Sequence, residues 1–485
     1  MKTISQLLLS LFAILLCLSC NTAHSQSLFQ VVPADANAVA LVDAERIASL
    51  AEVSTADLIA ALGGGSSSAI FEMLSSLVTN DTSLLHANRP WCIAATPHYE
   101  GAILAIEVND AKGLKRYFKQ QANSDNGIKF HQQADIFVCY DSHSALLSDG
   151  RVMIVAATDT SAESINYEKY LKLFSLDKND SFASSKVAAS LSECNGELRV
   201  AVNGKNISDK TDSLVLPDNM FGIIDIESLK GKSIITISAV ATSDESQKLL
   251  EEIGNGLTHI NGSLLKYIPS SAAAVVISAV DGSALTATNE EAITNQKVAE
   301  LLSDVDLLEG FNILETFAKV KGDFALFVDN IKSEDANILP IMFICQTDDD
   351  SLLDTIRQNC DAQWQKKGNG YIGKVADMPL YISYNKGIFA ASNYQNVTTL
   401  KAAKTPKHIA LDNQSILYTE MDLEATGEIF NEIFNTMSSP TVFTVATHQF
   451  NIKNIKINSS ATTPCRLELN FSDDTSNLYR LLELK

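Results

Sequence analysis

The feature that most constrains the fold of this chain is a stretch that occurs twice. "VVPADANAVALVDAERIASL" begins at residue 31, and "IPSSAAAVVISAVDGSAL" begins at residue 268. Pro33 matches Pro269, Val39 matches Val275 and Leu41 matches Ile277. We interpret each stretch as the first strand of a domain, with its proline at the strand edge. At 485 residues the chain is long enough for two domains.

The elements that follow the two stretches recur in the same order. "AILAIEVNDAKGLKRYFKQQ" predicts a strand and then a helix capped by Asp110, and "LPIMFICQTDDDSLLDTIRQN" repeats the pattern. Paired strands come next in both halves, and Thr242 and Glu245 predict a capping box for the helix that closes the first half. The sequence therefore predicts an α+β fold with two tandem similar domains, each a largely antiparallel sheet with helices packed on one face.

The N-terminus predicts export. Lys2 precedes an apolar run, Leu7 to Leu18, which is shorter than the about 20 residues that span a bilayer. Ser19 before Cys20 favours lipidation of Cys20, although Cys17 departs from the usual apolar residue of such signals. The alternative is cleavage near Ser25, which releases a soluble periplasmic protein. The predicted divisions are a signal peptide over 1–25, a first α+β repeat over 26–258 and a second over 259–485.

Composition narrows the classes of partner. The formal net charge is −21, and no Lys/Arg cluster stands out in the sequence, so nucleic-acid binding is not expected. The six cysteines after the signal have no ligand-like spacing, and several lie in apolar strand-like runs such as "WCIAAT". Export permits disulfides. We nevertheless favour buried free thiols over disulfides.

Motifs that resemble catalytic or binding sites have simpler structural interpretations. "GNGYIG", residues 368–373, precedes a strand instead of a helix, which predicts a turn and no dinucleotide site. "TDDDS", residues 347–351, predicts a helix cap, with weak calcium binding as the alternative. "GEIFNEIFNTM", residues 427–437, predicts a core helix, with a partner or acyl-chain groove as the alternative. The eight histidines are dispersed, and we assign no catalytic, cofactor or metal residue.

The leader, "VPADANAVALVD" soon after it, and the two similar halves resemble a Bacteroidota envelope family, domain of unknown function 4836. The resemblance extends over nearly the whole chain that follows the signal. It implies a cell-envelope protein, often lipid-anchored. It implies no activity and no catalytic residues.

We therefore expect a lipid-anchored cell-envelope protein that acts as a non-enzymatic binding or scaffold protein. The expected location is the outer membrane, facing the periplasm or the cell surface. The expected partners are the membrane, through the lipid at Cys20, and an envelope protein, glycan or lipid. The alternatives are a hydrolase with an unrecognised site and a lipid or acyl-chain carrier. Two carboxyls with raised pKa in a cleft would favour the hydrolase.

Overall fold

The computed structural model describes part of the chain in detail. The described residues are 25–62, 69–79, 83–99, 101–124, 127–157, 164–205, 219–255, 258–283, 318–330, 339–348, 350–360, 362–375, 378–402, 406, 408–409, 411, 414–433, 447, 451–460 and 463–480. They form two compact units. Unit 1 contains the described residues of Met1–Lys210, Leu216–Ser246 and Thr475–Lys485, and unit 2 contains those of Gln247–Asp474. The predicted boundary between residues 258 and 259 stays a prediction, because a compact unit and a folding domain need not coincide.

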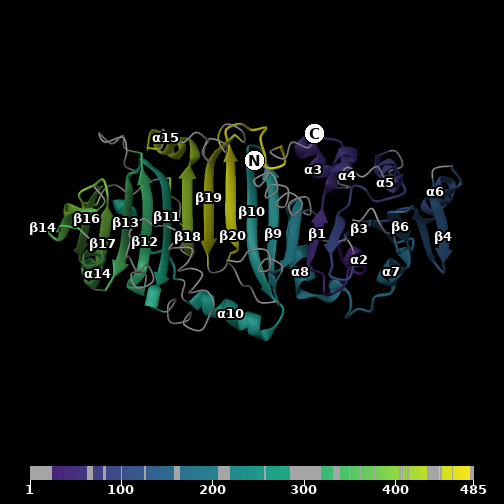
Figure 1. Cartoon of the computed structure of the whole chain (residues 1–485), viewed down its shortest axis with the longest axis horizontal. Helices are drawn as coiled ribbons and strands as arrows, with labels where there is room; N and C mark the ends of the chain where they lie inside the picture. Colours follow the sequence, from purple (N-terminus) through teal and green to yellow (C-terminus); the bar gives the residue numbers. More distant parts are fainter. Residues whose placement is uncertain are drawn as a thin grey trace. The chain divides into compact units, whose positions relative to one another are not determined.

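Unit 1 is built on an antiparallel sheet, several of whose strands are labelled in Figure 1. Its strands are β1 (Ala38–Val42), β2 (Trp91–Ala95), β3 (Ala102–Glu107), β4 (Lys129–Gln133), β5 (Ile136–Tyr140), β6 (Ser144–Ser148), β7 (Val152–Ala157), β8 (Leu198–Asn203), β9 (Met220–Leu229) and β10 (Lys232–Ala241). Among the described residues they pair in the order β4-β5-β6-β7-β3-β2-β1-β8-β9-β10.

The helices of unit 1 lie before, between and after these strands. They are α2 (Ser25–Phe29), α3 (Ala44–Ala51), α4 (Thr55–Leu62), α5 (Ala69–Thr79), α6 (Ala111–Asn123), α7 (Tyr167–Leu171) and α8 (Lys186–Glu193), with η1 (Lys172–Ser175) and η2 (Phe182–Ser184). Helix α10 (Asp244–Asn255) follows β10 along the chain. The expected cap of α6 is confirmed, since the Asp110 carboxylate accepts a hydrogen bond from the Gly113 N–H at 2.9 Å.

Unit 2 is also built on an antiparallel sheet. Its strands are β11 (Ala272–Asp281), β12 (Val320–Asp329), β13 (Ile341–Thr347), β14 (Gln365–Lys367), β15 (Gly370–Val375), β16 (Met378–Asn385), β17 (Ile388–Ser392), β18 (Ser415–Asp422), β19 (Ile452–Ser460) and β20 (Cys465–Phe471). Among its described residues the order is β14-β15-β16-β17-β13-β12-β11-β18-β19-β20. The helical segments are η3 (Leu265–Tyr267), α14 (Ser351–Asn359), η4 (Val397–Thr399) and α15 (Leu423–Ile433).

The prediction that helices pack on one face of each sheet is wrong for unit 1. Phe118 of α6 packs edge-on against Phe137 of β5, with ring centroids 5.4 Å apart. The neighbouring residue, Val138, belongs to the core cluster that contains Tyr170 of α7 and Leu191 of α8. Adjacent strand residues point to opposite faces, so helices cover both faces of this sheet. The reason is the composition of β6 and β7, which are buried at nearly every position and need cover on both sides.

Two predicted helix caps differ from those observed. Asp350 stands before α14, but its side chain makes no capping hydrogen bond. Helix α10 begins at Asp244, and the Ser243 hydroxyl accepts the Ser246 N–H at 3.2 Å. Thr242 lies one residue too early to cap, and its hydroxyl donates to the Asn219 carbonyl at 3.0 Å. Each helix therefore begins close to its predicted start, but Ser243 caps α10 and the Asp350 side chain makes no capping bond to α14.

Candidate functional site

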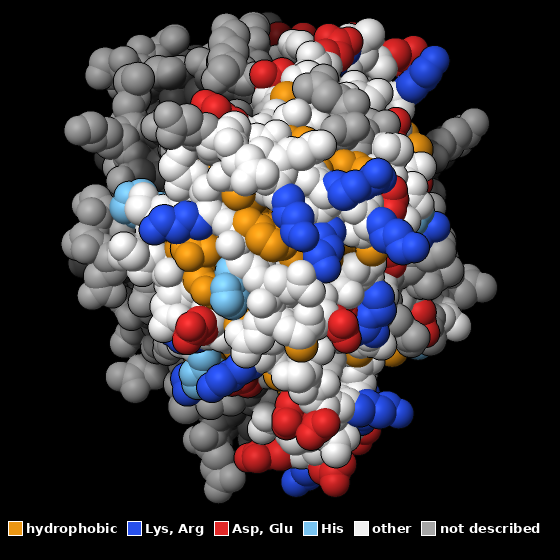
Figure 2. All heavy atoms as spheres, turned by 90° about the vertical axis from the view of Figure 1, so that its right-hand side faces the viewer, with side chains coloured by type: hydrophobic (Ala, Val, Ile, Leu, Met, Phe, Trp, Pro, Cys, Tyr) orange, Lys and Arg blue, Asp and Glu red, His pale blue; other side chains and the backbone are white. Residues whose placement is uncertain are grey.

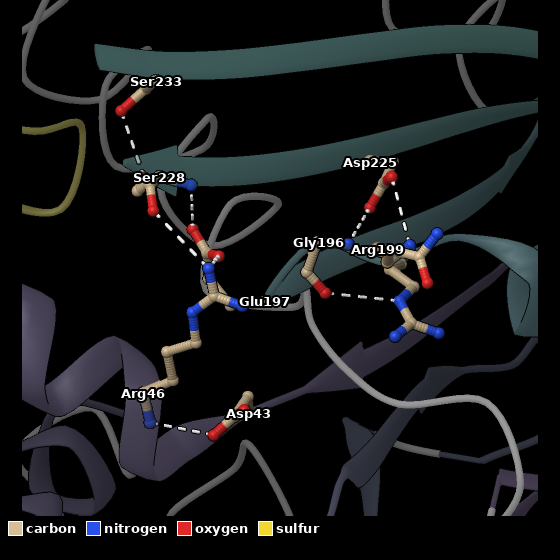
Figure 3. A network of polar contacts seen from close by, with 9 residues as sticks. Asp43, Arg46, Gly196, Glu197, Arg199, Asp225, Ser228 and Ser233 are labelled. Atoms are coloured by element: carbon tan, nitrogen blue, oxygen red, sulfur yellow. Dashed lines mark hydrogen bonds and ion pairs between the residues drawn. The ribbon is translucent and has the colours of Figure 1, made fainter. Parts of the chain in front are cut away.

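A buried carboxylate lies where β8 begins in unit 1 (Figure 3). The side chain of Glu197 is fully buried, and its Oε2 lies 2.9 Å from Nη2 of Arg46, which projects from α3 and is 40% exposed. Its Oε1 accepts the Ser228 N–H at 2.5 Å. Asp43 caps α3 by accepting the Arg46 N–H at 2.8 Å, which places the guanidinium at the start of the helix. This site holds one ion pair, of which only the arginine reaches solvent.

The surroundings of Glu197 favour its neutral form. Burial raises the pKa of this carboxyl to about 7, because the charged form loses its hydration. The ion pair with Arg46 and the hydrogen bonds from Ser228 act in the opposite direction without cancelling the effect of burial. Glu197 therefore changes charge near neutral pH.

A buried arginine and a half-buried aspartate lie on neighbouring strands beside this ion pair. Arg199 is fully buried, and it donates from Nη1 to the Leu191 carbonyl at 3.2 Å. Asp225 of β9 accepts the Gly196 N–H at 2.9 Å, and burial raises the pKa of its carboxyl. Residue 196 must be glycine, because a Cβ there would lie 2.1 Å from the Ile226 carbonyl oxygen. Together these contacts fix the segment between α8 and β8.

The C-terminal residues of unit 1 extend this network. The Ser233 hydroxyl lies 3.1 Å from the Ser228 hydroxyl and accepts the Leu478 N–H at 3.0 Å. Asn477 donates to the Leu50 carbonyl at the end of α3, also at 3.0 Å. Since Glu197 and Ser233 are both fully buried, the network is suited to holding unit 1 together and not to meeting a ligand.

A more accessible polar cluster lies on one face of β18, β19 and β20 in unit 2. Tyr418, Asn458 and Arg466 occupy one row across the three strands. Glu420, Lys456 and Glu468 occupy the next row. Residues paired across antiparallel strands point to the same face, so these six side chains form one polar array, which we call the polar ladder. Tyr418, at its edge, is buried in the core of unit 2.

Short contacts fix the polar ladder in place. The Glu420 carboxylate accepts the Tyr418 hydroxyl at 2.5 Å and lies 2.7 Å from the Lys456 ammonium. Arg466 lies 2.9 Å from Glu468, its neighbour on the same strand face. The exposed fractions are 15% for Glu420 and 35% for Lys456, so the centre of the ladder reaches solvent.

The polar ladder keeps Glu420 ionised. Burial raises the pKa of this carboxyl, but hydrogen bonds from Lys456 and Tyr418 lower it further, and the net pKa is below the ordinary value. Burial and the bond to Glu420 raise the pKa of the Tyr418 hydroxyl, which remains a donor. The ladder therefore presents two ion pairs, Glu420 with Lys456 and Arg466 with Glu468, with the neutral Asn458 beside them.

The strands at the same place in unit 1 carry a different surface. Val39 pairs with Ala201, which pairs with Ile223. The matching positions of unit 2 are Val275, Glu420 and Lys456. In unit 1 the row is apolar, and all three residues belong to the core cluster that contains Leu191 of α8. In unit 2 the described segment between β17 and β18 contains only the short helix η4.

The predicted motifs take the following places. Cys20 and the signal peptide, residues 1–25, lie outside the described residues except for Ser25. The first two residues of "GNGYIG" form the turn between β14 and β15, and the other four lie in β15, so the predicted turn is confirmed for Gly368 and Asn369. In "GEIFNEIFNTM", the predicted core helix, Ile429 is buried. The apolar side chains that follow Ile429 in this motif lie outside the described part of the chain. No group of three His, Cys, Asp or Glu side chains able to hold a metal ion occurs among the described residues.

The cysteines after the signal are free thiols, as expected. Cys92, Cys139, Cys345 and Cys360 are buried, and Cys194 and Cys465 are half-buried. Burial raises the pKa of the Cys345 thiol to about 12, which suppresses the reactive thiolate. None of the described helices is both long enough and apolar enough to cross a membrane.

Sequence comparison identifies the family. Residues 29–474 match the family described as "Domain of unknown function (DUF4836)". The chain belongs to this family. No curated protein matches it. Among solved structures, crystal form I of TP0453 is 12% identical over 48% of this chain and 88% of that chain, with a TM-score of 0.29. Crystal form III of TP0453 is also 12% identical, over 50% and 90%, with a TM-score of 0.28.

Sequence reasoning missed both polar sites. For the polar ladder a signal was present, because Arg466 and Glu468 alternate with apolar residues in "CRLELNF". That alternation alone predicts a solvated strand face. The pairing of Glu420 with Lys456 depends on strand register, which the sequence does not reveal.

Proposed function

We propose that the chain is an exported cell-envelope protein, anchored by lipid at Cys20, which binds a polar partner without catalysing a reaction. We further propose that its two units are tandem copies of one domain. Two observations support the copies: the repeated stretch that begins at residues 31 and 268, and the common order of ten strands among the described residues of each unit. The proposed location is the outer membrane.

The single observation that carries the binding function is the polar ladder. Its counterpart in unit 1 is apolar and lies in the core with α8, whereas Glu420 and Lys456 reach solvent. The Glu420–Lys456 ion pair, with Asn458 and the Arg466–Glu468 pair beside it, can exchange hydrogen bonds with a glycan or a polar protein surface. The ion pair is held by its neighbours before a partner arrives, which reduces the entropy lost on binding.

The pKa pattern supports binding over hydrolysis. A general acid needs a raised pKa and access to its substrate. Glu197 has the raised pKa, but its side chain is fully buried. Glu420 has access, but its pKa is lowered, so it remains an acceptor at neutral pH. Neither of these two carboxyls combines the two properties. Asp225 also has a raised pKa, but its carboxylate is occupied by the Gly196 N–H, so a binding role is better supported.

The first experiment is a pull-down of the tagged full chain from native membranes, with bound proteins, glycans and lipids read by mass spectrometry. The test variant is Glu420→Gln with Lys456→Gln, which keeps the side-chain size and removes both charges. The matched control is Lys321→Gln with Asp348→Asn, which removes an exposed ion pair of 2.7 Å from the same unit. We expect a stoichiometric partner that the test variant loses and the control keeps. A partner retained by both would refute the ladder as the binding face.

The second experiment tests the anchor by itself. Cys20→Ala removes the sulfur that would carry the lipid. We expect the variant to move from the membrane fraction to the soluble or unprocessed fraction, with loss of labelling by a fatty-acid analogue. A variant that stays in the membrane fraction as a processed protein would refute the lipid anchor.

A further inference from the structure

One helix of unit 1 carries an unusual concentration of positive charge. Lys112, Lys115, Arg116 and Lys119 lie on α6 at spacings of three and four residues, which places them on one side of the helix. The other side buries Leu114 and Phe118. The four cations extend over about 10 Å of the helix axis. We call them the basic stripe.

The basic stripe is not neutralised by the residues around it. No carboxylate lies within ion-pair distance of any of its four cations in the described part of the chain. Residues 111–123 contain no acidic side chain. Among the described residues, no cation of the stripe is held by a carboxylate.

Strand β4 extends the stripe with a charge and an aromatic ring. Lys129 is exposed beside half-buried Phe130, and the Lys119 ammonium lies 5.5 Å from the centre of that ring. Figure 2 looks onto the side of unit 1 where Figure 1 shows α6 and β4. Lys and Arg side chains gather across the middle of this view, with hydrophobic side chains between them. The surface is thus basic with apolar contacts inside it.

The contrast with the rest of the chain makes the stripe notable. The chain has 58 acidic side chains against 37 Lys and Arg. The helix at the matching place in unit 2, α14, has one arginine, and Arg357 forms an ion pair of 3.1 Å with Asp354. Position in the fold alone therefore does not require a basic helix here.

We propose that the α6 face of unit 1 binds an anionic lipid surface through the basic stripe. A planar array of phosphate headgroups can contact all four cations at once, and the ring of Phe130 suits the interface between headgroups and acyl chains. The net negative charge does not prevent this contact, because charges more than a Debye length from the membrane, about 8 Å at physiological salt, are screened. The choice of a membrane as partner rests on the export proposed above.

The lipid at Cys20 and the basic stripe would act as two signals. A polybasic patch adds electrostatic attraction to a lipid anchor and favours one orientation of the anchored protein on an anionic bilayer. Each lysine or arginine near an anionic surface adds about five-fold in affinity. The stripe would therefore hold unit 1 against the bilayer, with α6 toward the headgroups.

The test uses the chain from Ser25 onward, which contains every described residue and cannot be lipidated. Sedimentation measures its binding to vesicles of phosphatidylglycerol and phosphatidylethanolamine, and to vesicles of phosphatidylcholine alone. The test variant replaces Lys112, Lys115, Arg116 and Lys119 with glutamine. The charge-matched control replaces four exposed lysines of unit 2 with glutamine: Lys366, Lys367, Lys386 and Lys401. Thermal unfolding monitored at Trp91, in a Trp364→Phe background, checks that unit 1 is folded in both.

We expect the unmodified chain to prefer the anionic vesicles, and 1 M salt to abolish that preference. The stripe variant should bind at least about ten-fold more weakly, and the control should keep its affinity. Equal losses in the two variants, or no binding to anionic vesicles, would overturn the proposal. Binding to a short DNA duplex in place of vesicles would also overturn it, in favour of a soluble polyanion. The chain used here lacks Cys20, so a negative result would not bear on the lipid anchor. The Cys20→Ala experiment tests that anchor separately.

Discussion

Replacement of Glu197 by glutamine should change how the stability of unit 1 depends on pH. Burial raises the pKa of Glu197 from 4.5 to about 7 in the folded chain. The folded state therefore holds this proton more tightly than the unfolded state does. The contribution of Glu197 to stability is highest below pH 4.5, falls as the pH rises through the interval to about 7, and is constant above it. Glutamine at this position cannot titrate and removes that part of the slope.

The size of the effect follows from the two pKa values. At about 1.36 kcal/mol for each pH unit, the interval corresponds to roughly 3 kcal/mol of unfolding free energy. The side chain is fully buried, so solvent does not screen it. Glutamine can still accept the Ser228 N–H, and Arg46, which is 40% exposed, regains water when the ion pair is removed. We expect the variant to match the unmodified chain near pH 4.5 and to exceed it by roughly 2–3 kcal/mol at pH 8.

The assay is urea unfolding from pH 4.5 to pH 8, followed by tryptophan fluorescence. The chain has only two tryptophans, Trp91 in β2 and Trp364 before β14. A Trp364→Phe background therefore leaves Trp91 as a probe of unit 1. Subtracting the two pH profiles isolates Glu197, because every other titrating group is shared. Parallel profiles would refute the reasoning, as would a variant less stable than the unmodified chain at pH 8.

Three further outcomes are expected. Asn477→Ala removes the bond to the Leu50 carbonyl and should destabilise unit 1 by about 1–3 kcal/mol, measured by urea unfolding at Trp91. Gly370→Ala places a Cβ 2.0 Å from a backbone carbonyl oxygen. It should lower the unfolding free energy of unit 2, followed by Trp364 fluorescence, by about 1–3 kcal/mol. In the control Gly222→Ala no heavy atom lies within 4 Å of the new Cβ, and the unfolding free energy of unit 1 should change by less than about 0.5 kcal/mol. Cys345, whose pKa burial raises to about 12, should resist iodoacetamide at pH 8 until the chain unfolds, as mass spectrometry can follow.

The mixed α and β character and the antiparallel pairing could be predicted from local signals. Asp110 before an apolar helical pattern predicts the start of α6, and its carboxylate does cap the helix. "GNGYIG" predicts a turn because a strand follows it. The cover on both faces of unit 1 was missed, since a fully apolar strand such as Ser144–Ser148 shows no alternation that assigns one face to solvent.

The polar sites depend on contacts between distant residues, so periodicity could not reveal them. Glu197 follows a glycine in "CNGELRV" and looks like a solvent-exposed turn acid. It is buried because Arg46 and Ser228 come to it from elements far along the chain. The basic stripe could have been predicted from the sequence, because its four cations follow helical spacing within one expected helix. The acidity of the whole chain concealed it, since net charge says nothing about local charge.

The proposed duplication explains why one strand order can present different surfaces. The row of Val39, Ala201 and Ile223 must be apolar, because α8 lies over it and buried polar groups without partners are unfavourable. The matching row of unit 2 has only η4 in the described segment between β17 and β18, so Glu420 and Lys456 can reach solvent there. Helices α6 and α14 differ in the same way, with free cations on one and an ion pair on the other. Backbone order is set by the buried faces, which both units keep, whereas the exposed faces are free to diverge toward different partners. On this reasoning unit 1 supplies the contact with the membrane and unit 2 the contact with a polar ligand. The glutamine substitutions in the basic stripe should abolish only the membrane contact. The substitutions at Glu420 and Lys456 should abolish only the contact with the polar ligand.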